Sequence, residues 1–134
     1  MPDFWTRTAA ISLLSLGMFQ AALADDVTSA AELAFNNHCR ECHMIDHGDN
    51  RVGPSLCGII GRKAGSEAGF GNYSSAVKDS GIVWDAASID QWIENPNGFL
   101  PGNNMNPFPG VDDAAQRRLI IAYLSSATCG KPVN

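Results

Sequence analysis

Two cysteines and a histidine stand together in the run Cys39-x-x-Cys42-His43. The thiols are about one helical turn apart, the spacing at which the two vinyl groups of a porphyrin can each take up a thiol while the following imidazole ligates the iron. The other cysteines, Cys57 and Cys129, are isolated and do not supply the second ligand pair of a zinc site. A thioredoxin-like redox pair needs a βαβ context that the sequence lacks. The run therefore predicts one covalently attached haem c.

An iron held by one histidine leaves its other axial position to a methionine, to a histidine or to no ligand. Met105 is the candidate methionine, because the proline-rich loop 96–109 would hold its thioether at a fixed reach. Met44 directly follows the histidine and cannot easily reach the opposite face. His38 and His47 lie close to the attachment run and are expected to be surface histidines. The spacing alone leaves a second interpretation of Met105, as a loop methionine packed in a gap.

The first 24 residues have the pattern of a secretory signal peptide. Arg7 precedes an apolar run at residues 9–19, and Ala22-x-Ala24 matches the small-residue pattern of a cleavage site. Cleavage after Ala24 is expected, which leaves residues 25–134 as one domain in the bacterial periplasm. The apolar run is too short to span a bilayer, so no stable membrane anchor is expected, with a retained anchor as the alternative.

The formal net charge is −5, and loss of Asp3 and Arg7 with the leader leaves it unchanged. An acidic chain is not attracted to nucleic acid or to anionic membrane surfaces, so neither is expected as a partner. After haem attachment, two cysteines remain in an exported chain, which favours a Cys57–Cys129 disulfide over two buried thiols.

The elements that must position these side chains are helices. Apolar residues at helical spacing predict helices at residues 28–38, 73–79 and 86–95, and a last one from Asp112 or Asp113 onward. Thr28 or Ser29 is expected to cap the first helix, which delivers the attachment cysteines at its end. Residues 44–72 should be a long loop organised by the porphyrin, and residues 96–109 an extended stiff loop. No alternating strand pattern is present, so the expected fold class is all-α, with about four to five helices around one haem.

Four further motifs carry a family resemblance. From Phe35 onward the chain resembles the class I (mitochondrial-type) c-type cytochromes, close to the bacterial cytochromes c2. The motifs follow one another with nearly the family's gaps: Gly53–Lys63 for Gly-Pro-x-Leu-x-Gly-x-x-Gly-Arg, Gly81–Trp84 for Gly-Ile-x-Trp, then Glu94–Pro96 and Ile121–Leu124.

The resemblance implies a set of site residues. His43 would be the proximal and Met105 the distal iron ligand, with the Pro54 carbonyl accepting a hydrogen bond from the His43 ring. A second group would hold the inner haem propionate: Arg62, Tyr73, Trp84, and Asn103 in place of the family's usual threonine. Haem would be joined through Cys39 and Cys42. The first helix would cross the last with Ala31 and Phe35 against Ile120 and Tyr123.

Two departures from the family affect function. Trp92 stands where a tyrosine usually lies near the methionine sulphur, and the lysines that meet acidic partners are replaced by Asn104, Asp112 and Asp113. Electrostatic steering toward an acidic partner would therefore be weak or reversed.

The implied function is one-electron transfer and not enzyme catalysis. The protein would be a monomeric carrier between a membrane quinol–cytochrome c reductase type of donor and an oxidase or reductase acceptor, in respiration or photosynthesis. Two alternatives stay open at this point: a peroxidase or gas-binding haem protein with an open sixth site, and a dedicated electron-transfer subunit of a periplasmic dehydrogenase.

Overall fold

This computed structural model describes residues 15–130 of the chain; Arg7 and most of the apolar run at residues 9–19, on which the signal-peptide prediction depends, lie outside them. Five helices form in this part: α1 (Ser15–His38), α2 (Ser75–Asp79), α3 (Ala86–Glu94), α4 (Pro96–Phe99) and α5 (Ala114–Ser126). Between residues 15 and 130 there is no strand, only an isolated antiparallel bridge between Lys63 and Val83. The all-α prediction is confirmed. No helix in this range is both long and apolar enough to cross a membrane.

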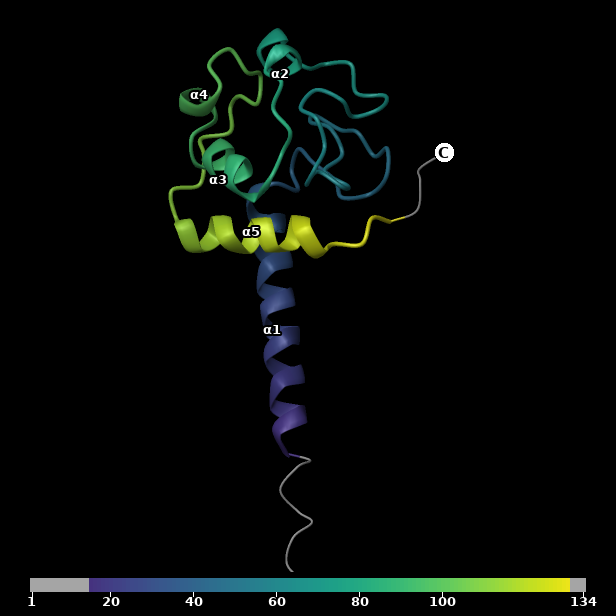
Figure 1. The fold of residues 1–134 in the computed structure, drawn as a ribbon, viewed down its shortest axis with the longest axis vertical. Helices are drawn as coiled ribbons and strands as arrows, with labels where there is room; N and C mark the ends of the chain where they lie inside the picture. Colours follow the sequence, from purple (N-terminus) through teal and green to yellow (C-terminus); the bar gives the residue numbers. More distant parts are fainter. Residues whose placement is uncertain (1–14, 131–134) are drawn as a thin grey trace, which may run out of the picture.

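Helix α1 is longer than the sequence predicts. It projects from the body as a single rod (Figure 1), and Thr28 and Ser29 lie inside it and not at its start. Their hydroxyls donate to the carbonyls of Ala24 and Asp25, each at 2.9 Å and one turn back. The prediction that either residue caps the helix is wrong, because bonding to the preceding turn uses the hydroxyl that a cap would need.

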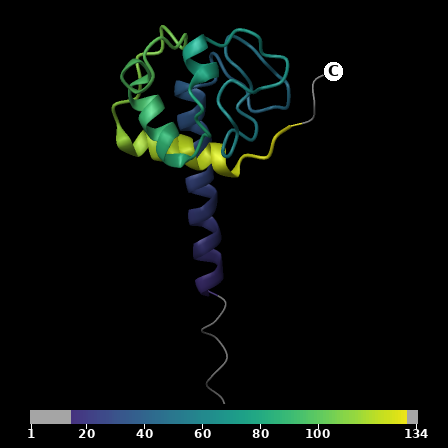
Figure 2. The ribbon, with the colours of Figure 1, turned by 45° about the horizontal axis from the view of Figure 1, so that its top comes forward.

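Helices α1 and α5 cross at the base of the body (Figures 1 and 2), and their crossing is the centre of the side-chain core. Phe35 and Ile120 are fully buried there, with Ala31 and Leu124 beside them. The rings of Phe35 and Tyr123 lie 4.8 Å apart. The predicted contact between the first and last helices is confirmed.

The short helices begin at capping residues. Asp85 accepts from the Ser88 N–H at 2.7 Å and so starts α3, close to the predicted boundary. Asn95 caps α4 by accepting from Gly98 N–H, and Pro96 at the first position has the backbone angle that a helix start needs. The expectation of an extended chain from residue 96 is therefore wrong for its first turn.

A buried arginine joins α3 to α5. Arg117 pairs with Asp90 at 2.8 Å, and its guanidinium also donates to the carbonyls of Val111 and Asp112 at 2.8 and 2.9 Å. Gly110 lets the segment that contains Val111 and Asp112 lie directly against α3. A β-carbon at position 110 would meet the Glu94 carbonyl oxygen at 2.2 Å. The end of the loop that contains Met105 is thus fixed to two helices.

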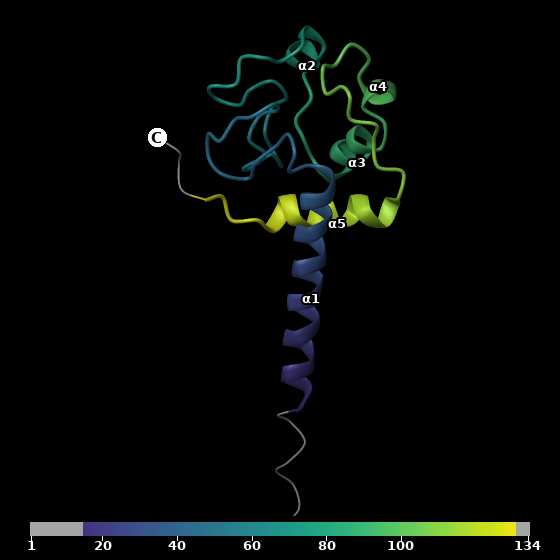
Figure 3. The same ribbon diagram turned by 180° about the vertical axis from the view of Figure 1, so that it is seen from behind.

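Residues 44–72 wind without helices on the side of the body opposite α3 and α4 (Figure 3). Ser55 is fully buried and holds the turns together, donating to the Asp46 carbonyl at 2.6 Å and accepting from Cys57 N–H at 3.2 Å. Cys57 is joined to Cys129, which follows α5, with 5.4 Å between their α-carbons. The predicted disulfide is confirmed, and it fastens the C-terminal segment to this loop.

Candidate cofactor pocket

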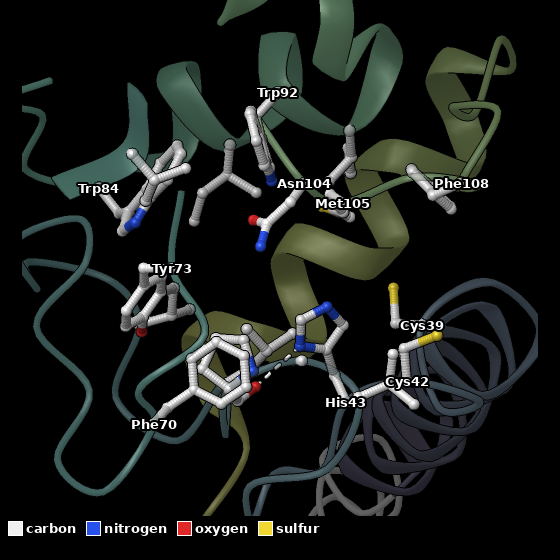
Figure 4. A pocket seen from close by; sticks show the side chains of 18 of the residues that line it. Cys39, Cys42, His43, Phe70, Tyr73, Trp84, Trp92, Asn104, Met105 and Phe108 are labelled. Atoms are coloured by element: carbon white, nitrogen blue, oxygen red, sulfur yellow. Dashed lines mark hydrogen bonds between the residues drawn. The ribbon is translucent and has the colours of Figure 1, made fainter. Parts of the chain in front are cut away.

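A cavity of about 350 Å³ opens between the end of α1, the loop 44–72, α3 and the Met105 loop (Figure 4). Its lining is mostly apolar, and eight of the nine predicted site residues belong to it: Cys39, Cys42, His43, Pro54, Arg62, Tyr73, Trp84 and Met105. The ninth, Asn103, does not line it. The structure therefore brings together side chains that are up to 66 positions apart, from Cys39 to Met105.

His43 is fixed on one wall by the backbone around it. Its Nδ1 lies 2.7 Å from the Pro54 carbonyl oxygen, and the side chain is only 9% exposed. Burial lowers the pKa of His43 below its ordinary 6.5, opposed by the Pro54 hydrogen bond and reinforced by Arg62. Because Nδ1 donates to the carbonyl, a neutral ring has its lone pair on Nε2, the form that binds a metal. Gly53 leaves room for the ring, since a β-carbon there would lie 2.2 Å from it.

Cys39 and Cys42 are free thiols at one edge of the cavity, beside His43 (Figure 4). Burial, helped by the neighbouring Cys42, raises the pKa of Cys39 to about 12. The thiol is therefore uncharged at ordinary pH. A thioether sulphur, bonded to carbon on both sides, is also uncharged and suits the same edge.

Met105 lies on the opposite wall from His43, with Trp92 and Phe108 beside it (Figure 4). The preceding residue, Asn104, ties this wall to the start of α2. Its amide nitrogen donates to the Asn72 carbonyl at 2.6 Å, and its oxygen accepts from the Ser74 N–H at 3.3 Å. A thioether and an imidazole thus face each other across one cavity.

Arg62 and Tyr73 form the polar end of the cavity. Arg62 donates to the carbonyls of Cys57 and Ser55, at 3.0 and 2.8 Å, and its guanidinium pairs with Glu67 at 2.5 Å. The Tyr73 hydroxyl accepts from Glu67 N–H at 3.3 Å, and burial raises the pKa of Tyr73, so the phenol stays neutral. A cation and a neutral phenol at one end of an apolar cavity suit a carboxylate.

Two residues that line the cavity, Phe70 and Asn104, and Glu67, which pairs with Arg62 of the cavity wall, were missed or assigned no role in binding. Glu67 lies five positions after Arg62 in a glycine-rich loop, and only the folded loop brings it onto the guanidinium. Phe70 packs edge-on to Tyr73 with 4.8 Å between ring centroids. Its position three residues before Tyr73, a predicted site residue, is the sequence feature that could have indicated a place in the pocket. By contrast, Asn103 donates to the carbonyls of Pro96 and Leu100 at 3.1 and 2.9 Å and belongs to the turn after α4.

The donor set fits haem c: an apolar, aromatic hollow, two thiols at one edge, a neutral imidazole, a facing thioether and a cationic end.

No protein-family model matches the chain. Curated relatives do: cytochrome c2 iso-2 of Magnetospirillum fulvum is 43% identical over 88 residues, 66% of this chain and 90% of the relative. The chain belongs to the class I c-type cytochromes. Cytochrome c2 of Rhodopila globiformis is 45% identical over 92 residues, 69% of this chain and 85% of that protein.

The solved structure of cytochrome cH from Methylobacterium extorquens matches with a TM-score of 0.66 and 41% identity, and covers 74% of this chain and 97% of that one. The predicted family and fold are confirmed. As a class I c-type cytochrome, the chain carries a covalent haem c, and its homologues are electron carriers, not enzymes.

Proposed function

We propose that this cytochrome is an exported one-electron carrier whose haem c is joined to Cys39 and Cys42 and ligated by His43 and Met105. The observation that carries the proposal is the cavity in which these two side chains lie on opposite walls, with Cys39 and Cys42, which form no disulfide, along one edge. Haem c bound there supplies an Fe(II)/Fe(III) couple. With both axial positions filled by the protein, no position is left for a substrate.

The surrounding residues orient the ligands and exclude water. The Pro54 carbonyl holds the His43 ring in one tautomer and one direction. Trp84 and Trp92, with 5.5 Å between ring centroids, give the cavity an apolar wall. A dry cavity raises the free energy of the oxidised, more charged state, and thioether ligation favours reduced iron, so a comparatively high potential is expected.

Arg62, Tyr73 and Trp84 are proposed to hold the inner propionate. Glu67 already shares the guanidinium of Arg62, so this propionate would lie close to a second carboxylate. Asn104 lines the cavity and replaces Asn103 in our assignment, since the Asn103 amide is bonded to backbone outside the cavity.

Export is proposed with cleavage after Ala24. Residues 24–29 of α1 are exposed, so the expected cleavage point lies on an exposed part of the helix. The new helix start would carry Asp25 and Asp26, whose charges favour a helix N-terminus. N-terminal sequencing of protein isolated from the periplasm should begin at Asp25; a chain that begins at Met1 and sediments with membranes would contradict both cleavage and periplasmic release.

The proposed partners are redox proteins, with a membrane quinol–cytochrome c reductase type of donor and an oxidase or reductase acceptor. The carrier would act as a monomer. Its net charge of −5 favours partners with a basic docking face.

Replacement of the distal ligand tests the assignment. Met105→Ala should abolish the sulphur-to-iron charge-transfer band of the ferric protein and lower the midpoint potential by on the order of 100 mV or more, because axial ligand identity sets haem potentials over a wide range. The reduced variant should also bind CO rapidly. Met44→Ala is the matched control, since Met44 follows His43 in sequence but does not line the cavity. If the band and potential survive in Met105→Ala, another side chain is the distal ligand and the assignment of Met105 is wrong. If the parent protein itself binds CO rapidly, the sixth site is open and the carrier proposal is wrong.

A further inference from the structure

The loop 44–72 carries a second group of reactive side chains outside the haem cavity. His47, Cys57 and Cys129 bring their nitrogen and sulphur atoms within 4.8 Å of one another, and none of the three lines the cavity. Nδ1 of His47 lies 3.2 Å from Cys57 Sγ, and Nε2 lies 3.5 Å from it. An imidazole is thus in contact with one sulphur of the disulfide.

The two sulphurs of this disulfide differ in environment. Cys57 is buried, with 7% of its surface exposed, and is the one that the His47 ring contacts. Cys129 is only partly buried and lies on the segment that follows α5. An attacking thiolate must approach one sulphur of the disulfide from solvent, in line with the S–S bond that breaks. Because Cys129 is the less buried of the two, it is the sulphur that is attacked, and Cys57 is the leaving group.

We propose that this disulfide is a second redox centre, which exchanges two electrons with a protein dithiol of the Cys-x-x-Cys class. In the first step, a thiolate of the dithiol bonds to Cys129 Sγ, and the Cys57–Cys129 bond breaks, releasing Cys57 as a thiolate. The His47 ring N–H donates a hydrogen bond to that departing sulphur, where charge develops. In the second step, the other thiol of the donor attacks the mixed disulfide and releases Cys129. The donor is oxidised to a disulfide, and its two protons end on Cys57 and Cys129.

A dithiol is favoured over a monothiol by the geometry of the loop. The α-carbons of Cys57 and Cys129 are 5.4 Å apart, and Ser55 holds the Cys57 turn in place through hydrogen bonds to Asp46 and Cys57. A released Cys57 thiolate therefore stays beside the mixed disulfide and expels a monothiol by closing the bond again. A second thiol on the same donor can compete with Cys57 for the mixed disulfide, because it too is held close and has a similarly high effective concentration.

The centre is separate from the haem but shares a loop with its pocket. The Cys57 carbonyl accepts from Arg62 at 3.0 Å, while the side chain of Cys57 points to His47 and Cys129. The haem spectrum can therefore report that the protein stays folded while the disulfide reacts, and failure of the exchange would leave the one-electron proposal untouched.

The first experiment measures the rate of disulfide reduction in the mature, haem-loaded protein. Dithiothreitol is added without denaturant, samples are quenched with a maleimide, and the mass increase on Cys57 and Cys129 is followed. The haem is first brought to the ferrous state with ascorbate, so that dithiothreitol has no ferric iron to reduce. The disulfide of the parent should then be reduced while its ferrous haem spectrum is unchanged. His47→Ala should slow reduction about tenfold, the loss expected for one hydrogen bond to a charged sulphur. His47→Gln keeps an N–H donor and should recover part of the rate.

Arg51→Gln is the matched control, because Arg51 is an exposed cation on the same loop that pairs with Asp49 and does not touch the disulfide. It should leave the rate within twofold of the parent. Equal rates for His47→Ala and the parent, or reduction of the parent only after denaturant is added, would overturn the proposal.

The second experiment locates the attack. A large excess of glutathione is added to the parent for a short time, the mixture is quenched in acid, and free thiols are alkylated before peptide mapping. In the chains that are trapped before Cys57 closes the bond again, glutathione should be found on Cys129 and the alkyl group on Cys57. Glutathione on Cys57 or on both cysteines would contradict the assigned order of events.

Discussion

At the residue scale, the site depends on how closely the backbone approaches His43. The ring is held between Gly53 and the Pro54 carbonyl, and its position is set by two adjacent residues of one loop. A glycine is required at 53 for space, since the clash there is with the rigid ring of a metal ligand and not with the end of a flexible side chain.

Gly53→Ala is expected to displace the His43 ring and destabilise the haem protein by about 1–3 kcal/mol, as for other overpacked sites. The reason is the 2.2 Å separation between the added β-carbon and Cε1 of His43. Denaturant titration followed by the Soret band measures the loss. Gly71→Ala is the control, because a β-carbon at Gly71 meets nothing within 4 Å. A Gly53→Ala protein as stable as the Gly71→Ala protein would show that the ring is free to move.

Stability should also fall with pH below 6.5. Burial keeps the pKa of folded His43 below its ordinary 6.5, so at pH values under 6.5 the unfolded chain binds a proton that the folded chain does not. Unfolding is therefore favoured as the pH falls, by at most about 1.4 kcal/mol per pH unit for this one proton.

The pKa values of Asp49 and Asp85 are held below 3.8 by their hydrogen bonds, so the contribution of these carboxylates to the free energy of unfolding is lost mainly in more acid solution. Denaturant titrations at pH 7.5, 6.5, 5.5 and 4.5 would therefore measure the pH range in which the His43 proton matters. A stability that stays flat from pH 6.5 to 4.5 would contradict the role given to His43.

At the element scale, the crossing of α1 and α5 positions the attachment cysteines. The cysteines follow α1 directly, and the His43 N–H bonds to the Cys39 carbonyl at 2.9 Å, continuing the helical path for one more turn. Any tilt of α1 against α5 would move the haem edge. The packing of Phe35 on Tyr123 and Ile120 therefore bears on function as well as on stability.

Phe35→Ala should destabilise the protein by about 3–5 kcal/mol, because it leaves a cavity at the fully buried centre of the crossing. Leu33→Ala, on the same helix with Leu33 59% exposed, should change stability by less than about 0.5 kcal/mol. Thermal unfolding of both variants, followed by circular dichroism, gives the comparison. Similar losses in the two would mean that α1 is not held at this crossing.

The same elements show what a single sequence can and cannot predict. The spacing of apolar residues placed α3 and α5 within a few residues, because each carries one buried face and a capping aspartate. The start of α1 was missed because Thr28 and Ser29 suit both a helix cap and the helix interior. The turn of α4 was missed because a proline-rich run predicts an extended chain, although proline is also a favoured first residue of a helix.

The site shows a similar division. Cys39, Cys42 and His43 could be assigned from a local motif, and Met105 from its loop and from family resemblance; all four line one cavity. Partners that meet only in the folded state could not be assigned: the pairing of Glu67 with Arg62 depends on the course of the loop 44–72, for which no periodicity exists.

At the scale of the whole molecule, two kinds of covalent link constrain the chain: the haem attachment and a disulfide. The expected thioethers would fix one edge of the haem to the turn after α1, and the Cys57–Cys129 bond joins the loop 44–72 to the segment after α5, 72 residues away in sequence. A domain of this size has a modest side-chain core, so constraints on the unfolded chain contribute a large share of its stability.

Cys129→Ser should lower the free energy of unfolding by about 4 kcal/mol, the chain-entropy value for a loop of this length. Cys129 is the better position to change, because it is partly exposed and a serine hydroxyl there can meet water, whereas the buried Cys57 site would add a desolvation cost. The measurement is a guanidinium titration of parent and variant, each with and without dithiothreitol. The difference should be present without reductant and vanish with it, since reduction converts the parent to the open chain. A difference of equal size in both conditions would mean that the variant is destabilised by lost packing and that the bond itself contributes little.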